Sequence, residues 1–236
     1  MTAAGTRFEA PRRSPPRRRL SGRLAAVLIA VVGIAIVVTT DQVIPAASAH
    51  QAQLRIWLAS RAAGIVTLVL LSLQIVLGLL LSHPTNRSTW QQSARWFSWH
   101  EHLWLFVLAF VAAHVVAIVA DPFAGVGFGG ALVPGLSSYR SPAVALGMLA
   151  LYALLVTGVT ARWTKLLPPG AWLSIHRLAI VVFALGWAHG LLAGTDSVAL
   201  VALYVLLASA VGGAAAYRYW VTRVARRHPP VPEVIR

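Results

Sequence analysis

Residues 99–114, WHEHLWLFVLAFVAAH, form an apolar stretch with histidines near one end and at the other. Residues 176–189, HRLAIVVFALGWAH, repeat this design later in the chain, with a histidine at each end. Each stretch belongs to an apolar run of about 20 residues, which is the length that a helix needs to cross a bilayer. The sequence therefore predicts two membrane-spanning helices that carry histidines inside them.

The rest of the chain has the composition of a membrane protein. Of its 236 residues, 58% are hydrophobic and only 11% are charged, whereas a soluble domain is about one-quarter charged. The apolar residues gather into six runs, at roughly 24–40, 55–81, 101–120, 142–161, 172–193 and 197–217. The predicted fold class is an all-α membrane protein, a six-helix transmembrane bundle over residues 24–220. What remains is too short for a soluble catalytic domain.

The charged residues predict the topology of this bundle. The net charge is +14, and the basic residues gather at both ends of the chain and in the loops 82–100 and 162–171. Basic loops stay on the cytoplasmic side during insertion. We therefore expect a multi-pass protein of the plasma membrane with two cytoplasmic tails, a disordered basic one at 1–23 and a short one at 221–236. This distribution indicates topology and contact with anionic lipid, and it argues against nucleic-acid binding.

The first apolar run has a second interpretation. It follows a basic stretch and precedes Ala47-Ser48-Ala49, a triplet of small residues like those at which secretory signals are cleaved. The run is long for a signal, and the triplet lies well beyond it. We therefore expect a retained first helix; its removal would leave the other helices in the same orientation.

The chain contains no cysteine. Structural disulfides, thiolate ligation of haem and iron–sulfur clusters are therefore excluded. Any redox chemistry must use a bound cofactor held by other residue types.

Helical geometry places His100 and His114 on nearly one face of their helix. Their separation of fourteen residues makes four turns less about 40°, with a rise of about 21 Å. His102 competes for the first position, but it is turned about 120° from His114. His100 is therefore preferred.

The second histidine helix fits less simply. His176 and His189 are thirteen residues apart, which leaves them about 140° out of phase on an ideal helix. Local tightening, a kink near Gly186 or approach to a cofactor from different sides is needed to bring both side chains into use.

Topology predicts which histidines share a level. Both helices follow a basic loop, so both run outwards; His100 and His176 then share the inner level, and His114 and His189 share the outer level. Ionisable residues are rare at membrane depth, and histidine is a common ligand of haem iron. We expect two haem b groups between the third and fifth helices, an inner one held by His100 and His176 and an outer one held by His114 and His189. Polar helix packing and a transition-metal site are the alternatives.

Arg61 and Phe183 are predicted to line the same cofactors. Arg61 lies inside the second apolar run, near the depth of His114. A buried arginine needs an anionic partner, and no nearby helix offers a carboxylate at that level, so a haem propionate or an anionic oxidant is expected there. Snorkelling to the interface is the alternative. Phe183 lies midway between His176 and His189, where it either shapes the gap between two haems or simply packs.

This pattern resembles the ferric reductase-like transmembrane domain, which is shared by ferric reductases, NADPH oxidases and the haem subunit of the methionine sulfoxide reductase system. The resemblance covers about residues 50–220. The resemblance rests on Arg61-Ala62-Ala63-Gly64, Trp99-His100 with His114, and His176 with His189. It implies six helices with two b-type haems. It also implies that electrons enter the cytoplasmic haem from a reduced flavin and leave at the outer haem.

The chain differs from the longer members of this family. Ferric reductases and NADPH oxidases carry flavin- and nicotinamide-binding domains after the sixth helix, and no dinucleotide fingerprint follows Tyr217 here. FAD and NAD(P)H are therefore expected on a separate cytoplasmic flavoprotein reductase, and the chain itself is expected to be an oxidoreductase component. An external redox partner, or a small acceptor such as ferric iron, dioxygen or quinone, is expected to take the electrons.

Two other functions stay open. The haem subunit of the sulfoxide reductase system is similarly short, but it typically lacks a counterpart of His100. A comparable membrane subunit of a periplasmic oxidoreductase, docked through loop 121–141, is the first alternative. A non-redox scaffold or transporter, whose histidines bind a metal ion or only pack, is the second.

Overall fold

The computed structural model describes residues 48–81 and 90–227. Regular structure in these two ranges is helical, with no strand. The elements are α2 (Ala49–Leu81), α3 (Trp90–Ala120), α4 (Gly127–Leu132), α5 (Ser141–Arg162), the short 3-10 turn η2 (Thr164–Leu166), α6 (Ala171–His176), α7 (Ala179–Ala193) and α8 (Val201–Arg227).

The described residues contain five helical segments that are long and apolar enough to cross a membrane. They are Ala49–Leu81, Trp96–Ala120, Ser141–Arg162, Ala171–Ala193 and Val201–Val224. The protein is therefore a multi-pass helical membrane protein, as its composition predicts. The first of the six predicted helices, at 24–40, lies outside the described residues, and so does the tail predicted at 1–23.

The helices differ in length from the apolar runs that predict them. α3 begins at Trp90 rather than near 101, and α8 continues to Arg227 rather than ending near 217–220. An apolar run marks where a helix crosses hydrocarbon, whereas backbone hydrogen bonding continues into the polar interface. At its other end α8 is shorter than predicted, because residues 194–200 form a connection before it.

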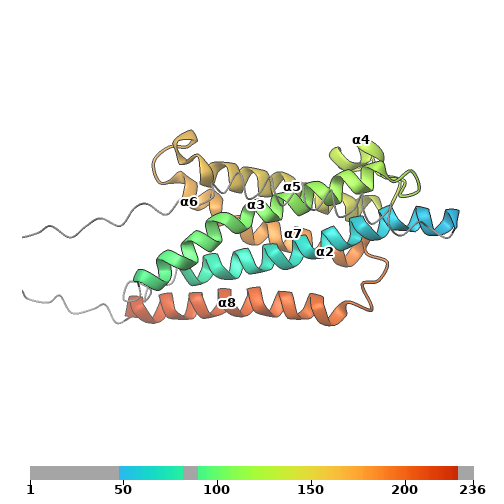
Figure 1. Cartoon of the computed structure of the whole chain (residues 1–236). Coiled ribbons are helices and arrows are strands. Elements are labelled where there is room, and N and C mark those ends of the chain that lie inside the picture. The colour runs from blue at the N-terminus through green and yellow to red at the C-terminus, as the bar shows by residue number, and fades with distance from the viewer. Residues whose placement is uncertain (1–47, 82–89, 228–236) are drawn as a thin grey trace, which may run out of the picture.

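The long helices run side by side, with α4 at one end of the bundle and α6 towards the other (Figure 1). α2 packs against α3, α7 and α8, and α5 packs against α6 and α7. Along the chain α3, α5 and α7 each run antiparallel to the long helix before them (Figure 1). As a result α3 and α7 run in the same direction, so the start of α3 and the start of the α6–α7 segment lie at the same end of the bundle.

The buried core lies where α2, α3, α7 and α8 meet. It includes Leu71 on α2, Val107 on α3, Val182 and Phe183 on α7, and Leu207 on α8. In lipid, apolar side chains gain little from leaving the acyl chains, so close approach of backbones at small residues contributes more to helix association. Gly64 and Gly78 on α2 and Gly147 on α5 are small residues of this kind, and each lies next to a histidine ring of a neighbouring helix.

The fifth apolar run is broken between α6 and α7, directly after His176. Here the N–H of Leu178 donates to the Ile175 carbonyl (2.9 Å), and that of Val181 donates to the Leu178 carbonyl (2.8 Å). Such i to i−3 bonds wind the chain by about 120° per residue instead of about 100°. Over the three or four residues of the break this adds about 60–80°, which is roughly half of the 140° by which His176 and His189 are out of phase on an ideal helix. The break lies after His176 and not at Gly186, the other position considered, because α7 runs through Gly186 without interruption.

Candidate functional site

Four histidine side chains meet as two pairs between α3 and the α6–α7 segment. The ring centres of His100 and His176 are 6.0 Å apart, and those of His114 and His189 are 6.2 Å apart. The two rings of each pair stand nearly perpendicular, at 88° and 75°. The structure thus brings together the histidines that topology matches by depth.

Three of these rings have their neutral tautomer set by the backbone of a neighbouring helix. The Nδ1 atom lies 3.1 Å from the Gln74 carbonyl oxygen in His100 and 2.7 Å from that of Ser60 in His114. In His189 it lies 2.8 Å from the Ala143 carbonyl oxygen. A carbonyl oxygen can only accept, so Nδ1 carries the proton in each neutral ring. The Nε2 atom then keeps a free lone pair, which is the form that binds a metal.

His176 is the exception among the four. Its Nδ1 atom is buried and, among the described residues, has no hydrogen bond of normal distance and angle. The backbone of Thr157 on α5 is a partner for this ring, but the contact falls outside that geometry. The inner pair therefore contains one ring with a well-formed hydrogen bond and one with a weaker backbone contact.

Three glycines leave the room in which the rings lie. An added Cβ would stand 3.2 Å from the His114 ring at Gly64, 3.0 Å from the His100 ring at Gly78 and 2.7 Å from the His189 ring at Gly147. All three distances are shorter than ordinary non-bonded contacts of about 3.5 Å. These glycines were not among the predicted site residues, although Gly64 and Gly78 have the same fourteen-residue spacing as His100 and His114.

His102 lies outside this arrangement. Its side chain is exposed, and its Nδ1 atom is 2.6 Å from the Ser98 carbonyl oxygen of its own helix. His100 is therefore the histidine at this end of α3 that faces a partner ring, as the helical phase predicts.

A cavity of about 210 Å³ surrounds the His114–His189 pair. Its wall is mostly apolar and comes from α2, α3, α5 and α7, with Tyr204 of α8 on one side. Arg61 and Asp196 also line it. An apolar chamber with two imidazoles and a few polar groups is typical of a small-molecule or cofactor site.

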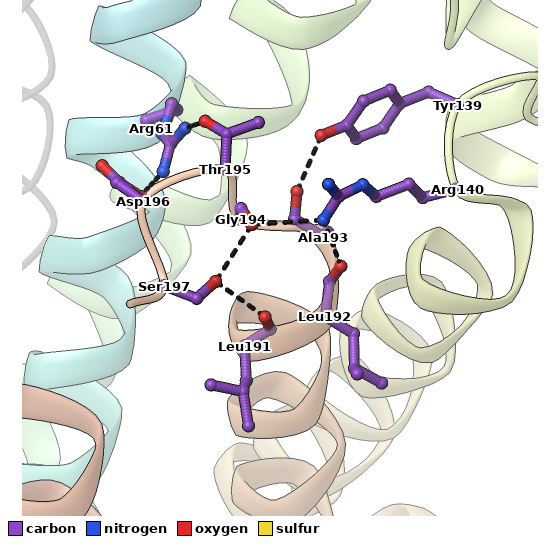
Figure 2. A network of polar contacts seen from close by, with 10 residues as sticks. All are labelled: Arg61, Tyr139, Arg140, Leu191, Leu192, Ala193, Gly194, Thr195, Asp196 and Ser197. Atoms are coloured by element: carbon purple, nitrogen blue, oxygen red, sulfur yellow. Dashed lines mark hydrogen bonds and ion pairs between the residues drawn. The ribbon is translucent and has the colours of Figure 1, made fainter. Parts of the chain in front are cut away.

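Arg61 has a partner that the sequence argument excluded. Its guanidinium forms an ion pair with Asp196 and donates a hydrogen bond to the Thr195 hydroxyl, as Figure 2 shows. It also lies 5.9 Å from the centre of the Trp57 ring. The expectation that no carboxylate reaches this level is wrong, because the connection after α7 brings Asp196 against α2. A haem propionate is thus not needed to neutralise Arg61.

Two further residues at this end were not predicted from the sequence. The Tyr139 hydroxyl donates to the Ala193 carbonyl (2.8 Å), and Nη1 of Arg140 donates to the carbonyls of Leu192 (2.8 Å) and Gly194 (3.2 Å; Figure 2). The last carbonyls of a helix lack partners within it and attract a cation. Arg140 and Tyr139 therefore cap α7 and hold the connection that carries Asp196. No local sequence signal reveals this, because the partners are more than fifty residues apart.

Phe183 is buried on α7, with 7% of its side chain exposed. It belongs to the central core cluster together with Val107 and Leu71. Helix packing alone accounts for this burial, and its part in shaping a gap between two haems stays a prediction.

No group of three or more histidine, aspartate or glutamate side chains that could hold a metal ion occurs in the described part of the chain. Each histidine pair thus stands by itself. Comparisons with protein-family models, with curated proteins and with solved structures find no match for this chain.

Proposed function

We propose that this protein is a di-haem b-type transmembrane electron-transfer protein. In this proposal His100 and His176 hold one haem, and His114 and His189 hold the other. The observation that carries it is the spacing of the two ring pairs, 6.0 and 6.2 Å between centres. A ring nitrogen lies about 2 Å from the metal that it binds, and the ring centre lies about 1 Å beyond, so two rings on one metal have centres about 6 Å apart.

The number of ligands favours haem over a bare metal ion. A structural transition-metal site usually has about four protein ligands, and a catalytic one has about three. Each site here offers two imidazoles without a third ligating side chain among the described residues. Two axial histidines suffice for a haem, because the porphyrin supplies the remaining donors.

The chain's own residues would position and insulate these groups. The haems, when bound, would supply one-electron transfer, because bis-histidine ligation leaves no open position for a substrate. The apolar walls of the cavity exclude water, and the backbone carbonyls of Ser60, Gln74 and Ala143 hold the imidazoles. An acceptor would then be reduced at the rim of the cavity, where Arg61 and Asp196 lie.

The resemblance to the ferric reductase-like transmembrane domain supports electron flow from the cytoplasmic side to the outside. We infer that a cytoplasmic flavoprotein reductase donates electrons at the His100–His176 level. Ferric iron, dioxygen, quinone or an external redox partner would accept them at the His114–His189 level. The close approach of His100 to His176 favours the two-haem members of this family over the sulfoxide reductase subunit, which typically lacks the first of these histidines.

A haem count on detergent-purified protein tests this function. We expect two b-type haems per chain, with low-spin spectra in the oxidised and dithionite-reduced states. His114→Ala and His189→Ala should each leave one haem per chain, and so should His100→Ala. His102→Ala is the matched control and should keep both.

Two results would overturn the assignment. One is a colourless protein after expression with ample haem, which would favour a scaffold or transporter. The other is the retention of two haems in both His114→Ala and His189→Ala.

A further inference from the structure

We infer that the backbones of α2 and α5 hold the ligand rings at four positions, which we call seats. A complete seat is a carbonyl at position i together with a glycine, which has no side chain, at position i+4. We infer further that the fourth seat is incomplete and that this makes His176 the weakest electron donor to iron among the four ligands. This inference rests on the proposed function, because its effect is measured on the bound haem.

The seat follows from helix geometry. The carbonyl of residue i points at the N–H of residue i+4, so these two residues lie side by side on the helix surface. A ring that donates to that carbonyl must cross the place where the side chain of residue i+4 begins. A glycine at i+4 therefore leaves the carbonyl accessible to a second hydrogen-bond donor, in addition to the N–H of residue i+4.

Three seats are complete, each with its carbonyl four residues before its glycine. They are Ser60 with Gly64 for His114, Gln74 with Gly78 for His100, and Ala143 with Gly147 for His189. On α2 the two seats are fourteen residues apart, which matches the separation of the two rings on α3. The two seats on α2 are therefore spaced along the helix axis as the two rings on α3 are.

The fourth seat lies fourteen residues beyond Ala143, at Thr157. Its position i+4 is Ala161, so a methyl group stands where the other seats have none. The backbone of Thr157 does contact His176, yet Nδ1 of that ring has no hydrogen bond of normal distance and angle. The seat without glycine is therefore the one, among the four described, that holds its ring by a weaker contact.

The seats on α2 also hold the backbone of α3. The Ser60 hydroxyl donates to the His114 carbonyl (3.3 Å), and the Gln74 side-chain amide donates to the His100 carbonyl (3.0 Å). The Thr157 hydroxyl instead donates to carbonyls of its own helix, those of Ala153 and Leu154. Among the contacts described, His176 therefore has the weaker ring contact and no side-chain hydrogen bond to its own carbonyl.

A hydrogen bond from Nδ1 to a carbonyl makes the imidazole a stronger electron donor to the iron. Stronger electron donation stabilises the ferric form, whose charge is higher, and so makes the reduction potential of the haem more negative. Bringing the Thr157 contact of His176 into normal hydrogen-bond geometry should therefore move the potential of the inner haem downwards. Weakening the bond at His100 should move the same potential upwards.

Ala161→Gly and Gly78→Ala test these opposite effects by optical redox titration. We expect Ala161→Gly to shift the haem of the His100–His176 pair to a more negative potential and to leave the other haem unchanged. Gly78→Ala should shift the same haem to a more positive potential or release it, giving one haem per chain. Ala145→Gly on α5 and Gly212→Ala on α8, where an added Cβ meets nothing within 4 Å, are the matched controls.

The outcomes separate this inference from the proposed function. Wild-type protein without haem would refute the function itself. Wild-type protein with two haems, together with potentials and haem content in Ala161→Gly and Gly78→Ala that equal those of the controls, would refute the seats alone. The haem count and the two potentials are read from the same samples.

Discussion

At the scale of single residues, the protein orients three of the four imidazoles through hydrogen bonds to backbone atoms. Carbonyl oxygens of Ser60, Gln74 and Ala143 accept from Nδ1, and this leaves the Nε2 lone pair of each ring free. A carboxylate would hold a ring in the same way, but at membrane depth it would have to be stripped of water at considerable cost. Backbone carbonyls supply the same orientation without adding a charge.

The glycines below the rings predict a graded series of variants. Gly147→Ala, Gly78→Ala and Gly64→Ala would place a methyl 2.7, 3.0 and 3.2 Å from the nearest ring atom. The ring must move most where this distance is shortest. We therefore expect haem loss to be largest in Gly147→Ala, which should lose most of the haem of the His114–His189 pair, and smallest in Gly64→Ala. The pyridine haemochrome count per chain measures it, with Gly212→Ala as control; equal retention in all three variants would contradict the prediction.

At the scale of elements, the connection 194–200 joins helices that are distant in the sequence. It binds Arg61 of α2 through Asp196 and Thr195, while Arg140, just before α5, caps the end of α7. Arg61 is only 15% exposed, whereas Asp196 is 46% exposed. The pair therefore lies at the boundary of the cavity, with its acid towards the outside. It closes one side of the chamber around His114 and His189.

Replacing Asp196 tests how much the ion pair with Arg61 stabilises the fold. Asp196→Asn removes the charge and leaves a largely buried guanidinium with the Thr195 hydroxyl alone. A half-exposed ion pair contributes about 1 kcal/mol, which corresponds to a decrease in Tm of about 2–4 °C in a chain of this size. Thermal unfolding in detergent, followed by tryptophan fluorescence, measures it. Glu101→Gln, at an exposed position of α3, is the control; an equal Tm for the two variants would show that the ion pair does not stabilise the fold.

At the scale of the whole molecule, the two ends of the bundle differ in charge. Arg162, Lys165 and Arg177 lie around α6, at the end where α8 also finishes, whereas Asp196 and α4 lie at the opposite end (Figure 1). Positive residues are retained on the cytoplasmic side. The His100–His176 pair, which lies at the basic end, is therefore expected to face the cytoplasm.

Cysteine labelling tests this orientation directly, because the native chain has no cysteine to remove. A membrane-impermeant maleimide should label Phe128→Cys on α4 in intact cells. It should label Lys165→Cys only after permeabilisation. Phe128 and Lys165 are both exposed, so access to the side chain does not limit either reaction. The reverse pattern would invert the topology and the direction of electron flow.

Part of the site could be predicted from the sequence because the relevant quantities are local to one helix. The rise between His100 and His114, and the order of the helices, set the depth of each ring whatever its neighbours are. The seats were readable in part, since Gly64 and Gly78 repeat the spacing of the histidines. Their meaning depends on which helix lies opposite, and the periodicity of one helix does not contain that information.

By itself the sequence determined that this is a multi-pass helical membrane protein and which histidines share a level, because hydropathy, charge and helical rise act along a single segment. Only the tertiary structure decided that Asp196 reaches Arg61, that Arg140 caps α7, and that carbonyls of α2 and α5 hold the rings. It also decided that the fifth apolar run is interrupted after His176 and not at Gly186. The physical reason is that these contacts join residues far apart in the chain, and side-by-side packing of helices, rather than the order of residues within one helix, brings them together.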